Sequence, residues 1–415
     1  MTNFKKICVL GLGYVGLPTA AIFASRGIQV FGVDTNIKTI ETINQGKIHI
    51  IEPGLDLLVN KSVSTGRLSA NSQPERSDAY IIAVPTPFEK TYKPNLTFIE
   101  AAVRSIAPVL QRGALVILES TSPIGTTEKI CQWLAEERKD LSLPNKAGDD
   151  ADIQVSHSPE RVLPGNVLKE IINNDRVIGG ISSNCARRTE QLYKIVIKGK
   201  CLLTTAATAE FIKLSENAYR DVNIAFANEL SIVADKVGIN IWQAIELANH
   251  HPRVNILQPG PGVGGHCIAV DPWFIVDSAP NNTALIQSAR KVNDSKPEFI
   301  VDKILLAAQK TGARTIACFG LAYKADIDDF RESPALLITA SLKKRFDGEV
   351  LVVEPNIKKL PDILSQEKGI SLCSLNESLK RSQVVALLVD HREFRELDRV
   401  LLDKKVIIDT RGVWS

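Results

Sequence analysis

The segment PGPGVGGHCIAVDPWF, residues 259–274, places a cysteine in a run of glycines and prolines. Such a run predicts a loop whose backbone approaches a ligand closely, and Cys267 lies near its end. Nearby backbone N–H groups or a helix start would stabilise the thiolate, so Cys267 is a candidate nucleophile. The competing interpretation is a small, buried and inert thiol, which is the ordinary state of a cysteine in a reducing compartment.

A metal site is a second alternative for Cys267, with His266, His250 or His251 as its partners. Adjacent residues rarely converge on one ion, and the spacing typical of zinc sites is missing. The chain has seven cysteines, an odd number, and no CxxC pair. This pattern disfavours a disulfide framework and a structural zinc site, and we expect no metal.

A polar constellation lies in the segment that follows residue 205. Lys213, Asn217 and Arg220 are spaced i, i+4 and i+7, so they share one face of a helix. A solvated polar face is the simpler interpretation, but the neighbouring sequence SENAYRDVNIAFANE carries few charges and indicates partial burial. A partly buried lysine either titrates near neutrality or stays charged and stabilises an oxyanion; both roles remain open.

A glycine fingerprint follows the first apolar run of the chain. Gly11, Gly13 and Gly16 form G-x-G-x-x-G between a predicted strand and a predicted helix, the arrangement that holds a dinucleotide pyrophosphate at a helix N-terminus. A second strand ends at Asp34, which is placed to accept from a ribose hydroxyl. A carboxylate there repels a 2′-phosphate, so we expect NAD rather than NADP. A glycine-rich turn without a ligand is the alternative.

The elements around these residues alternate short apolar strands with helices, which is typical of a parallel α/β sheet. The predicted strands of the first third are Ile7–Leu10, Gln29–Val33, Ala79–Val84, Leu115–Glu119, Ile153–His157 and Arg176–Ile178. Helices are predicted from Ala207 to Lys236 and from Ile241 to Ala248. Residues 144–150 are expected to form a flexible loop.

A second α/β pattern begins near Arg314, and VFGVD and YIIAVP near the start of the chain resemble LVVEP and VALLVD near its end. This second pattern lacks the glycine fingerprint. We therefore predict two Rossmann-like, doubly wound α/β domains joined by a central helical domain with a long spine helix. The expected domains are residues 1–203, which bind the dinucleotide, 204–312, which are helical, and 313–415, with a ligand in the cleft that faces the carboxyl ends of both sheets.

The apolar face of the long helix contains Phe211, Leu214, Ala218, Val222 and Ala225 at helical spacing. It suits packing, and an exposed stripe on this helix would suit a second subunit.

The composition excludes several classes of protein. Hydrophobic residues make up 44%, charged residues 23%, and the net charge is +3. No dense basic block indicates a nucleic-acid or membrane surface partner. No apolar stretch is long enough for a membrane span or a signal peptide, so we expect a cytoplasmic protein.

Several segments together resemble the UDP-sugar dehydrogenases of the UDP-glucose/GDP-mannose dehydrogenase family. They occur in the family's order over nearly the whole chain: GLGYVGLPTA, VPTP, ESTSPIGTTE, SPERVLPG, KLSENAYRDVNIAFANEL, GPGVGGHCIAVDP and GLAYKADIDDFRESPA. The stretches HPRVNILQPGPGVGGHCIAVDPWF and NDRVIGG are similar to the branch that oxidises UDP-N-acetyl-D-mannosamine.

This resemblance implies a four-electron oxidation of the sugar C6 alcohol to a carboxylate with two NAD in turn. Cys267 would capture the intermediate aldehyde as a thiohemiacetal, which is then oxidised to a thioester and hydrolysed. Lys213 would be the acid/base or oxyanion partner, with Asn217 as its neighbour. Asp271, and Glu160 with Thr121, would hold the lysine and the hydrolytic water. The expected product serves a bacterial surface polysaccharide, such as enterobacterial common antigen or a capsule.

The resemblance also implies binding residues. Beside the glycine fingerprint and Asp34, the NAD positions are Tyr14, Val15, Thr86, Thr121, Thr127 and Arg331. The UDP-sugar positions are Glu160, Arg161, Val162, Lys213, Asn217, Arg220, His251, Arg253, Gly264, Tyr323 and Lys324. In the family the loop that carries Arg253 can serve the neighbouring subunit, which agrees with a homodimer formed through the central helices.

Two departures from the UDP-glucose enzymes bear on the sugar. Arg161 and Val162 follow Pro159-Glu160 where those enzymes show P-E-F-L, and Val270 stands where they carry a lysine. Both favour an N-acetylated sugar, with UDP-N-acetylglucosamine or UDP-glucose as alternatives. A non-catalytic NAD-binding module, and a hydroxyacid-type dehydrogenase that needs no cysteine, are the hypotheses from other classes.

Overall fold

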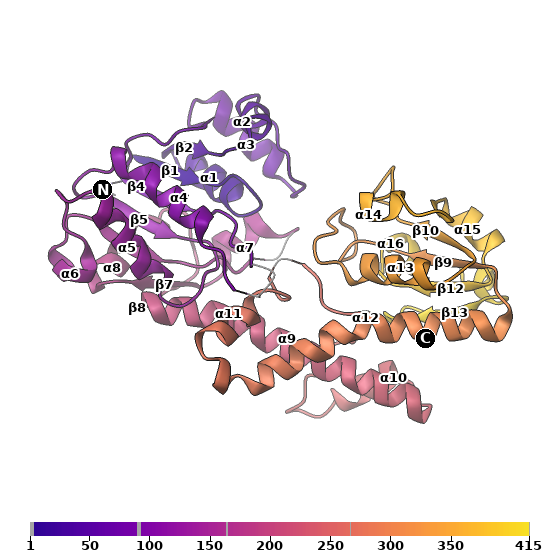
Figure 1. Cartoon of the computed structure of the whole chain (residues 1–415). Helices are drawn as coiled ribbons and strands as arrows, with labels where there is room; N and C mark the ends of the chain where they lie inside the picture. The colour runs from indigo at the N-terminus through magenta and orange to yellow at the C-terminus, as the bar shows by residue number, and fades with distance from the viewer. Residues whose placement is uncertain (1–3, 89–92, 163–164, 266, 415) are drawn as a thin grey trace. The chain divides into compact units, whose positions relative to one another are not determined.

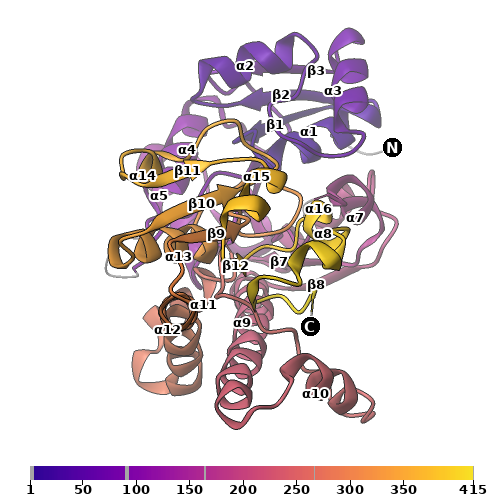
Figure 2. The same ribbon diagram turned by 90° about the vertical axis from the view of Figure 1, so that its right-hand side faces the viewer.

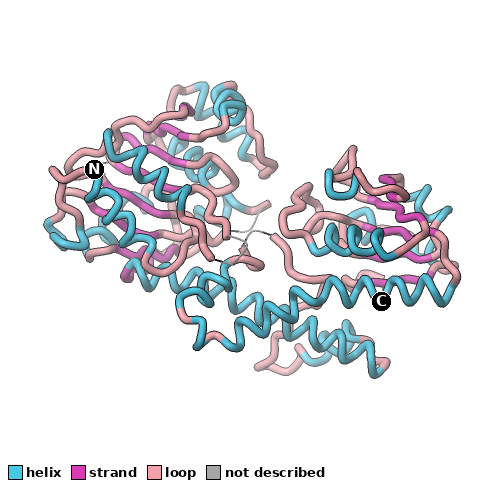
Figure 3. The backbone as a smooth tube through the Cα atoms, viewed as in Figure 1, coloured by secondary structure: helices cyan, strands magenta, loops and turns pink. Residues whose placement is uncertain are grey.

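The computed structural model describes residues 4–88, 93–162, 165–265 and 267–414. They form two compact units. The first comprises the described residues of Met1–Ser215 together with Trp273–Ser278, and the second comprises Glu216–Pro272 and Ala279–Ser415. In both units helices alternate with the strands of one sheet (Figure 3). The three predicted domain boundaries stay a prediction.

The sheet of the first unit has the strand order β3-β2-β1-β4-β5-β6-β7-β8. Figure 1 labels β2, β1, β4, β5, β7 and β8 of this sheet. Its strands are β1 (Lys6–Leu10), β2 (Gln29–Val33), β3 (Leu68–Asn71), β4 (Ala79–Ile82), β5 (Leu115–Leu118), β6 (Gln154–His157), β7 (Arg176–Gly180) and β8 (Cys201–Thr205). The predicted strands are confirmed to within two residues at each end. The sequence reasoning missed β3 and β8, which are the two edge strands of this sheet.

One strand pair departs from the predicted parallel sheet: β6 and β7 are antiparallel, with His157 opposite Gly179. The chain between them contains helix α7 (Val167–Asn173) but turns back at the carboxyl edge of the sheet. Arg176, the first residue of β7, therefore contacts Ser158 and Glu160, which directly follow β6. The expectation of an all-parallel sheet is wrong at this point.

Two apolar clusters cover the two faces of this sheet, because side chains alternate along each strand. In β1, Ile7 and Val9 belong to the cluster that includes α1, whereas Cys8 and Leu10 belong to the other. The helices of this unit are α1 (Gly16–Ser25), α2 (Ile37–Asn44), α3 (Leu55–Ser64), α4 (Thr97–Ile106), α5 (Thr126–Glu137), α6 (Pro144–Ala147), α7 and α8 (Ser183–Tyr193).

The flexible loop expected over residues 144–150 is wrong. These residues form α6 and a 3-10 turn. Asp149 accepts hydrogen bonds from the Ser183 hydroxyl and the Asn184 amide, which belong to the start of α8. The polar residues of this segment suggested a loop. One of them, Asp149, instead accepts hydrogen bonds at the N-terminus of α8.

The predicted spine helix is confirmed as α9 (Ala206–Val237), 32 residues long, followed by α10 (Ile241–Ala248). Leu214, Ala218 and Ala225 are buried as expected. Phe211 was expected on the same packed face, yet its side chain is 50% exposed. Among the described residues, no helix is long and apolar enough to span a membrane.

In the second unit α9 is joined to α12 (Ala284–Thr311) by buried polar contacts. Arg290 donates to Asp221 at 2.6 Å, and Asn293 donates to the same carboxylate at 2.8 Å. Asn228 then donates to Asn293 and accepts from the Gly260 amide. The glycine-proline loop that precedes Cys267 is thereby tied to both long helices.

The C-terminal sheet is parallel throughout its described strands, in the order β11-β10-β9-β12-β13. Figure 2 labels β11, β10, β9 and β12 of this sheet. Its strands are β9 (Thr315–Phe319), β10 (Glu349–Val353), β11 (Ile370–Leu372), β12 (Val384–Leu387) and β13 (Val406–Asp409). The remaining helices are α11 (Asp271–Ser278), α13 (Pro334–Arg345), α14 (Asp362–Ser365), α15 (Leu375–Arg381) and α16 (Arg392–Arg395). The strand order reverses between β9 and β12, where doubly wound sheets bind ligands at their carboxyl ends.

Lys296 of α12 is 97% buried, with its ammonium hydrogen-bonded to Ser231 Oγ at 2.5 Å. Burial lowers the pKa of Lys296 to about 8. Because an unfolded lysine binds its proton up to a pH near 10.4, the unfolded state holds more protons between these values, and stability rises with pH there.

Lys296→Met should therefore stabilise the chain at pH 7 by up to about 3 kcal/mol, because methionine removes the buried charge and has a side chain of similar volume to lysine. The difference from wild type should shrink as the pH rises from 8 to 10. Urea unfolding of both proteins across this range measures it. A difference that is independent of pH would contradict the assignment.

Candidate active site

The glycine fingerprint folds as its spacing predicts. Gly11 has φ +86°, and a Cβ there would lie 2.5 Å from the Ala83 carbonyl oxygen. A Cβ on Gly16 would lie 1.8 Å from the Gly11 oxygen, so this glycine lets α1 approach the turn. Gly13 has no atom within 4 Å of an added Cβ. The space beside Gly13 is thus open on the side where a pyrophosphate meets the first turn of a helix.

Asp34 holds the fingerprint turn from the end of β2. Its Oδ2 accepts from the Leu12 amide at 3.0 Å, and its Oδ1 accepts from the Asn36 amide at 2.9 Å. The carboxylate remains partly exposed, with lone pairs left for a ribose hydroxyl. The open side of Gly13 and this carboxylate fit an adenosine diphosphate moiety.

The other predicted cofactor positions differ in exposure. Tyr14 is 39% exposed, and Val15 precedes the first turn of α1. The Thr86 hydroxyl donates to the Thr121 carbonyl at 2.5 Å, which joins the turns after β4 and β5. Arg331, from the second unit, pairs with Asp329. Their contacts with NAD stay predictions.

Thr127 is fully buried at the start of α5, and its surroundings are occupied by protein. Its amide and its hydroxyl both donate to Glu210 Oε1, at 2.8 and 2.6 Å, and Glu210 Oε2 accepts from the Gly125 amide. Glu210 of α9 thus occupies the N-terminus of α5. The sequence reasoning missed Glu210, because its partner lies more than 80 residues away in the chain.

A buried ion network lies where β6 turns back to β7. Arg176 donates to Glu160 Oε2 at 3.0 Å and also pairs with Glu119. Tyr193 donates to Glu119 at 2.7 Å, and Ser158 accepts from Arg176. Burial raises the pKa of Glu119, an effect that Arg176 opposes.

Glu160 was predicted to help hold Lys213 and the hydrolytic water. Its own carboxylate is fixed by hydrogen bonds from the protein. One of its oxygens is bound by Arg176, and the other accepts from the Arg161 amide at 2.6 Å. Arg161 also donates to the Asp175 carbonyl, and Val162 packs against the core. Arg176 and Glu119 were not singled out from the sequence, because the antiparallel turn that joins them to Glu160 was not foreseen.

Lys213 and Asn217 lie one turn apart on α9, and both are buried, whereas Arg220 is exposed. Burial lowers the pKa of nearby His157 to about 3, and the charges of Arg176 and Lys213 add to this shift. His157 therefore stays uncharged at neutral pH beside Lys213. It is a further residue that the sequence reasoning missed.

Asn217 connects α9 with the cysteine loop. Its Nδ2 donates to Asp271 Oδ2 at 2.5 Å. The Asp271 amide in turn donates to the Cys267 carbonyl at 2.8 Å. Asp271 is the first residue of α11, so the predicted helix start lies one turn after Cys267. Hydrogen bonds thus connect three of the four predicted catalytic residues: Asn217 to Asp271, and Asp271 to Cys267.

Cys267 is exposed, whereas the other cysteines are buried or half-buried. Burial raises the pKa of the thiols of Cys8, Cys131 and Cys318 to about 12, and that of Cys373 to about 11. These thiols stay protonated at neutral pH and are poor nucleophiles. Exposure therefore distinguishes Cys267 from them. His266 lies outside the described residues.

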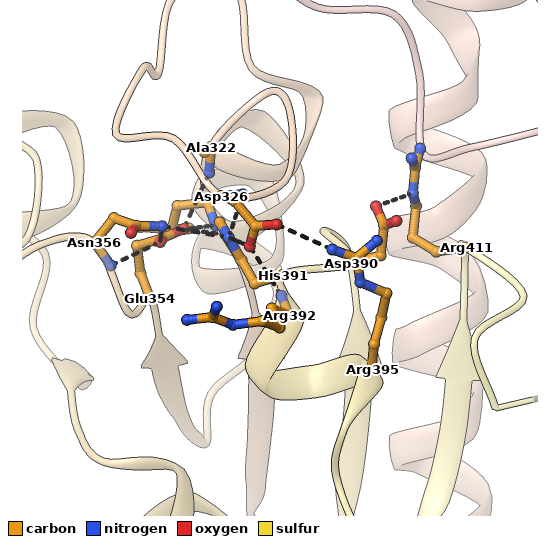
Figure 4. Close-up of polar contacts among 10 residues, drawn as sticks. Ala322, Asp326, Glu354, Asn356, Asp390, His391, Arg392, Arg395 and Arg411 are labelled. Carbon is orange, nitrogen blue, oxygen red and sulfur yellow. Dashed lines mark hydrogen bonds and ion pairs between the residues drawn. The ribbon is translucent and has the colours of Figure 1, made fainter. Parts of the chain in front are cut away.

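A small cleft lies at the switch point of the C-terminal sheet. Tyr323 and Lys324 line it after β9, and Asp390 and Arg411 line it after β12 and β13. Arg411 donates to Asp390 at 3.0 Å (Figure 4). The loop residues Pro261 and Gly262 form its wall. Arg411 was missed, although its place directly after the last strand, in DTRG, was a signal for this edge.

The remaining predicted sugar ligands lie on the loop around the cysteine. His251 and Arg253 follow α10 and are exposed, and the Arg253 amide donates to His251 Nδ1 at 3.4 Å. Gly264 has the Glu332 carbonyl oxygen and the Tyr323 side chain within 3 Å of an added Cβ. Substrate contacts of all three residues stay predictions.

A glycine-rich dinucleotide turn, a second doubly wound sheet and an exposed cysteine are typical of a dinucleotide-dependent dehydrogenase. The chain belongs to the UDP-glucose/GDP-mannose dehydrogenase family. The family's NAD binding domain matches residues 5–197, its central domain residues 207–295 and its UDP binding domain residues 317–415. The protein is an NAD-dependent UDP-sugar dehydrogenase, as the sequence predicted.

The names of several relatives refer to N-acetylated sugars. The chain is 56% identical to an NDP-N-acetyl-D-galactosaminuronic acid dehydrogenase of Ralstonia nicotianae, over 100% of this chain and 97% of the relative. It is 58% identical to a UDP-N-acetyl-D-mannosamine dehydrogenase of Campylobacter jejuni, over 96% and 98% of the two chains. A solved UDP-N-acetyl-D-mannosamine dehydrogenase of Pyrococcus horikoshii superimposes with a TM-score of 0.89 at 39% identity, over 98% and 96%.

Two glycine variants should separate cofactor binding from folding. Gly13→Ala should leave the melting temperature unchanged, because the added methyl group meets open space, and should raise the KM for NAD at least about tenfold, the equivalent of about 1.4 kcal/mol. Gly16→Ala should lower the melting temperature, because its Cβ meets the Gly11 carbonyl. Thermal unfolding and steady-state kinetics measure both. An unchanged KM for NAD in Gly13→Ala would contradict the pyrophosphate assignment.

Proposed function

We propose that the protein is a UDP-N-acetyl-D-mannosamine 6-dehydrogenase. It oxidises the C6 alcohol of the sugar to a carboxylate, and the product is UDP-N-acetyl-D-mannosaminuronate. The arrangement that carries the proposal is the exposed Cys267 thiol, one turn before Asp271, whose carboxylate accepts from Asn217. The choice of sugar is supported by the relatives from Campylobacter jejuni and Pyrococcus horikoshii.

In the proposed mechanism each NAD, when bound, accepts one hydride, and two NAD serve one sugar. Lys213 takes the proton of the C6 hydroxyl in the first oxidation. The Cys267 thiolate then attacks the C6 aldehyde, and Lys213 stabilises the oxygen of the thiohemiacetal. After the second oxidation has given the thioester, a water molecule held by Glu160 and Thr121 attacks it, and the Cys267 thiolate leaves.

The supporting residues keep these groups in place. Asn217 fixes the Asp271 carboxylate, and Asp271 fixes the Cys267 backbone. Arg176 and the Arg161 amide each bind one oxygen of Glu160, and the remaining lone pairs of this fixed carboxylate can accept a hydrogen bond from a water molecule. The UDP moiety is assigned to the C-terminal cleft, where Lys324 and Arg411 supply positive charge for the diphosphate.

A galacto-configured sugar is the second candidate. It is favoured by the relatives from Ralstonia, whose names refer to N-acetyl-D-galactosaminuronic acid and whose identity reaches 56%. UDP-N-acetylglucosamine and UDP-glucose remain the alternatives that the sequence left open. The proposed product is a uronate for a bacterial surface polysaccharide, such as enterobacterial common antigen or a capsule, made in the cytoplasm.

The purified protein should form two NADH for each UDP-N-acetyl-D-mannosamine consumed, because two hydrides leave C6. UDP-N-acetylgalactosamine, UDP-N-acetylglucosamine and UDP-glucose should react more slowly in the same absorbance assay. NADH formation with a galacto-configured sugar alone would replace the proposed substrate by the second candidate.

Cys267→Ser in the same assay tests the covalent step. It should reduce formation of the acid by on the order of a thousandfold, because a catalytic nucleophile is removed. Cys373→Ser, at a half-buried thiol whose pKa burial raises to about 11, is the matched control and should keep wild-type turnover. Full turnover of Cys267→Ser would favour a cysteine-independent dehydrogenase.

We also propose a homodimer formed through α9. Tyr219, Phe226 and Val233 recur every seven residues on this helix and are 65%, 52% and 51% exposed. Such a stripe is typical of a helix that packs against another helix.

Phe226→Glu should convert the dimer to a monomer, as measured by light scattering, because it places a charge in the centre of the stripe. Leu337→Glu, at an equally exposed leucine of α13, should leave the dimer intact. A monomeric wild-type protein would overturn this proposal.

A further inference from the structure

The C-terminal sheet repeats the backbone geometry of the dinucleotide turn. The Gly320 amide donates to the Val353 carbonyl at 2.8 Å with φ +90°, just as the Gly11 amide donates to the Val33 carbonyl at 2.8 Å with φ +86°. In both sheets an acidic residue follows the neighbouring strand. Glu354 accepts from the Leu321 amide at 2.8 Å, in the position where Asp34 accepts from the Leu12 amide.

The two acidic residues differ in what else they contact. Asp34 is partly exposed, whereas the Glu354 side chain is completely buried. Glu354 Oε2 accepts from two backbone amides and from His391 Nε2, and Oε1 accepts from the amide and side chain of Asn356. Glu354 is therefore filled with donors from the protein, and the position that faces a ribose in the first sheet has become structural in the second.

His391 completes this arrangement from the other side of the switch point, where it follows β12. Its ring is fully buried; Nδ1 accepts from the Asp326 amide at 2.9 Å, so the proton lies on Nε2, which donates to Glu354 at 3.0 Å. Burial alone would raise the pKa of Glu354, but the hydrogen bonds from His391 and the backbone outweigh it and leave the pKa below its usual value.

The turn from Leu321 to Asp326 is consequently held at both ends (Figure 4). Its first two amides are bound by Glu354, and its last amide is bound by His391. Asp326 itself has φ +62°, accepts from the Arg392 amide at 2.9 Å and pairs with Arg395 at 3.0 Å. A left-handed aspartate is tolerated here because its side chain is fixed by these donors.

The same turn carries the residues that face the functional site. Lys324 and Tyr323 line the C-terminal cleft. The Tyr323 ring lies against the cysteine loop, where a Cβ on Gly265 would be 2.8 Å from ring atom Cε2. Gly265 precedes Cys267 by two residues. A displacement of the turn would therefore move both a cleft cation and the backbone beside the thiol.

We propose that His391 is a positioning residue for this reaction: together with Glu354 it fixes the turn Leu321–Asp326, and through it the place of Lys324 in the cleft and of Tyr323 against the cysteine loop. The His391 side chain is fully buried, and His391 is not among the residues that line the cleft. The inference rests on the proposed roles of the cleft and of Cys267.

Two conservative variants divide the contacts of His391. His391→Gln keeps a donor near Nε2 for Glu354 but loses the acceptor for the Asp326 amide. His391→Asn keeps an acceptor near Nδ1 but loses the donor to Glu354. Loss of either buried hydrogen bond should weaken UDP binding, measured by calorimetry, and raise the KM for the UDP-sugar about tenfold, or about 1.4 kcal/mol. The KM for NAD should stay within about twofold. Iodoacetamide should alkylate Cys267 at a changed rate.

Gln383→Ala is the matched control. Gln383 accepts from the Arg314 and Thr315 amides, both at 3.0 Å, at the opposite end of the same sheet. It should affect stability without moving the KM for the UDP-sugar. An unchanged KM and unchanged UDP affinity in both His391 variants, or a fall in turnover that only follows the melting temperature, would overturn the proposal.

If the His391 variants do not fold, hydrogen exchange of the wild-type protein still tests whether the turn from Leu321 to Asp326 is fixed. The amides of Leu321, Ala322 and Asp326 should exchange far more slowly than those of an ordinary surface turn. Exchange at the rate of an unprotected turn would overturn the proposal. A wild-type enzyme that shows slow exchange and binds UDP, but oxidises a UDP-sugar other than UDP-N-acetyl-D-mannosamine, would overturn the proposed function and leave the positioning role standing.

Discussion

Both crevices depend on one kind of hydrogen bond. In each sheet a carboxylate accepts it from the backbone amide of the residue after the glycine that follows a strand. Asp34 makes it in the first sheet and Glu354 in the second. Each carboxylate ties two neighbouring strands together at their carboxyl ends, where a doubly wound sheet binds its ligands. A charge-assisted hydrogen bond of this kind is stronger than a neutral one, so the turn between strand and helix is kept in one conformation. The phosphate-facing backbone is then ready before a nucleotide arrives.

The catalytic groups depend on a different constraint, the direction of β7. A parallel strand would have placed Arg176 at the amino edge of the sheet. The antiparallel reversal brings it to the carboxyl edge, where it neutralises Glu119 and Glu160 together. Without this cation the two neighbouring carboxylates would repel each other. The antiparallel reversal therefore supplies a fixed acceptor at Glu160, and an arginine is buried beside it.

Local patterns predicted the parts of the molecule that local physics decides. The glycines at 11, 13 and 16 report sterics within one turn, and the strands with continuous apolar runs were placed to within two residues. Long-range pairings left no local trace. Glu210 binds the start of α5 from a distant helix, and the Arg176 network depends on a strand reversal that no apolar pattern indicates. The polar residues 144–150 indicated a loop because their helix-capping partner, the start of α8, is not adjacent in sequence.

The similarity of VFGVD and LVVEP shows why a pattern alone does not decide function. Both segments end a strand with an acid that holds the neighbouring turn, and the sequence predicts the same backbone for both. Burial and His391 then give the two acids different roles. Asp34 keeps lone pairs for a ligand, whereas both oxygens of Glu354 accept hydrogen bonds from donors of the protein. A second dinucleotide could not be bound through Glu354 without breaking these bonds. The C-terminal crevice therefore lacks the partly exposed carboxylate that Asp34 provides in the first sheet, because the protein's own donors, His391 among them, occupy Glu354.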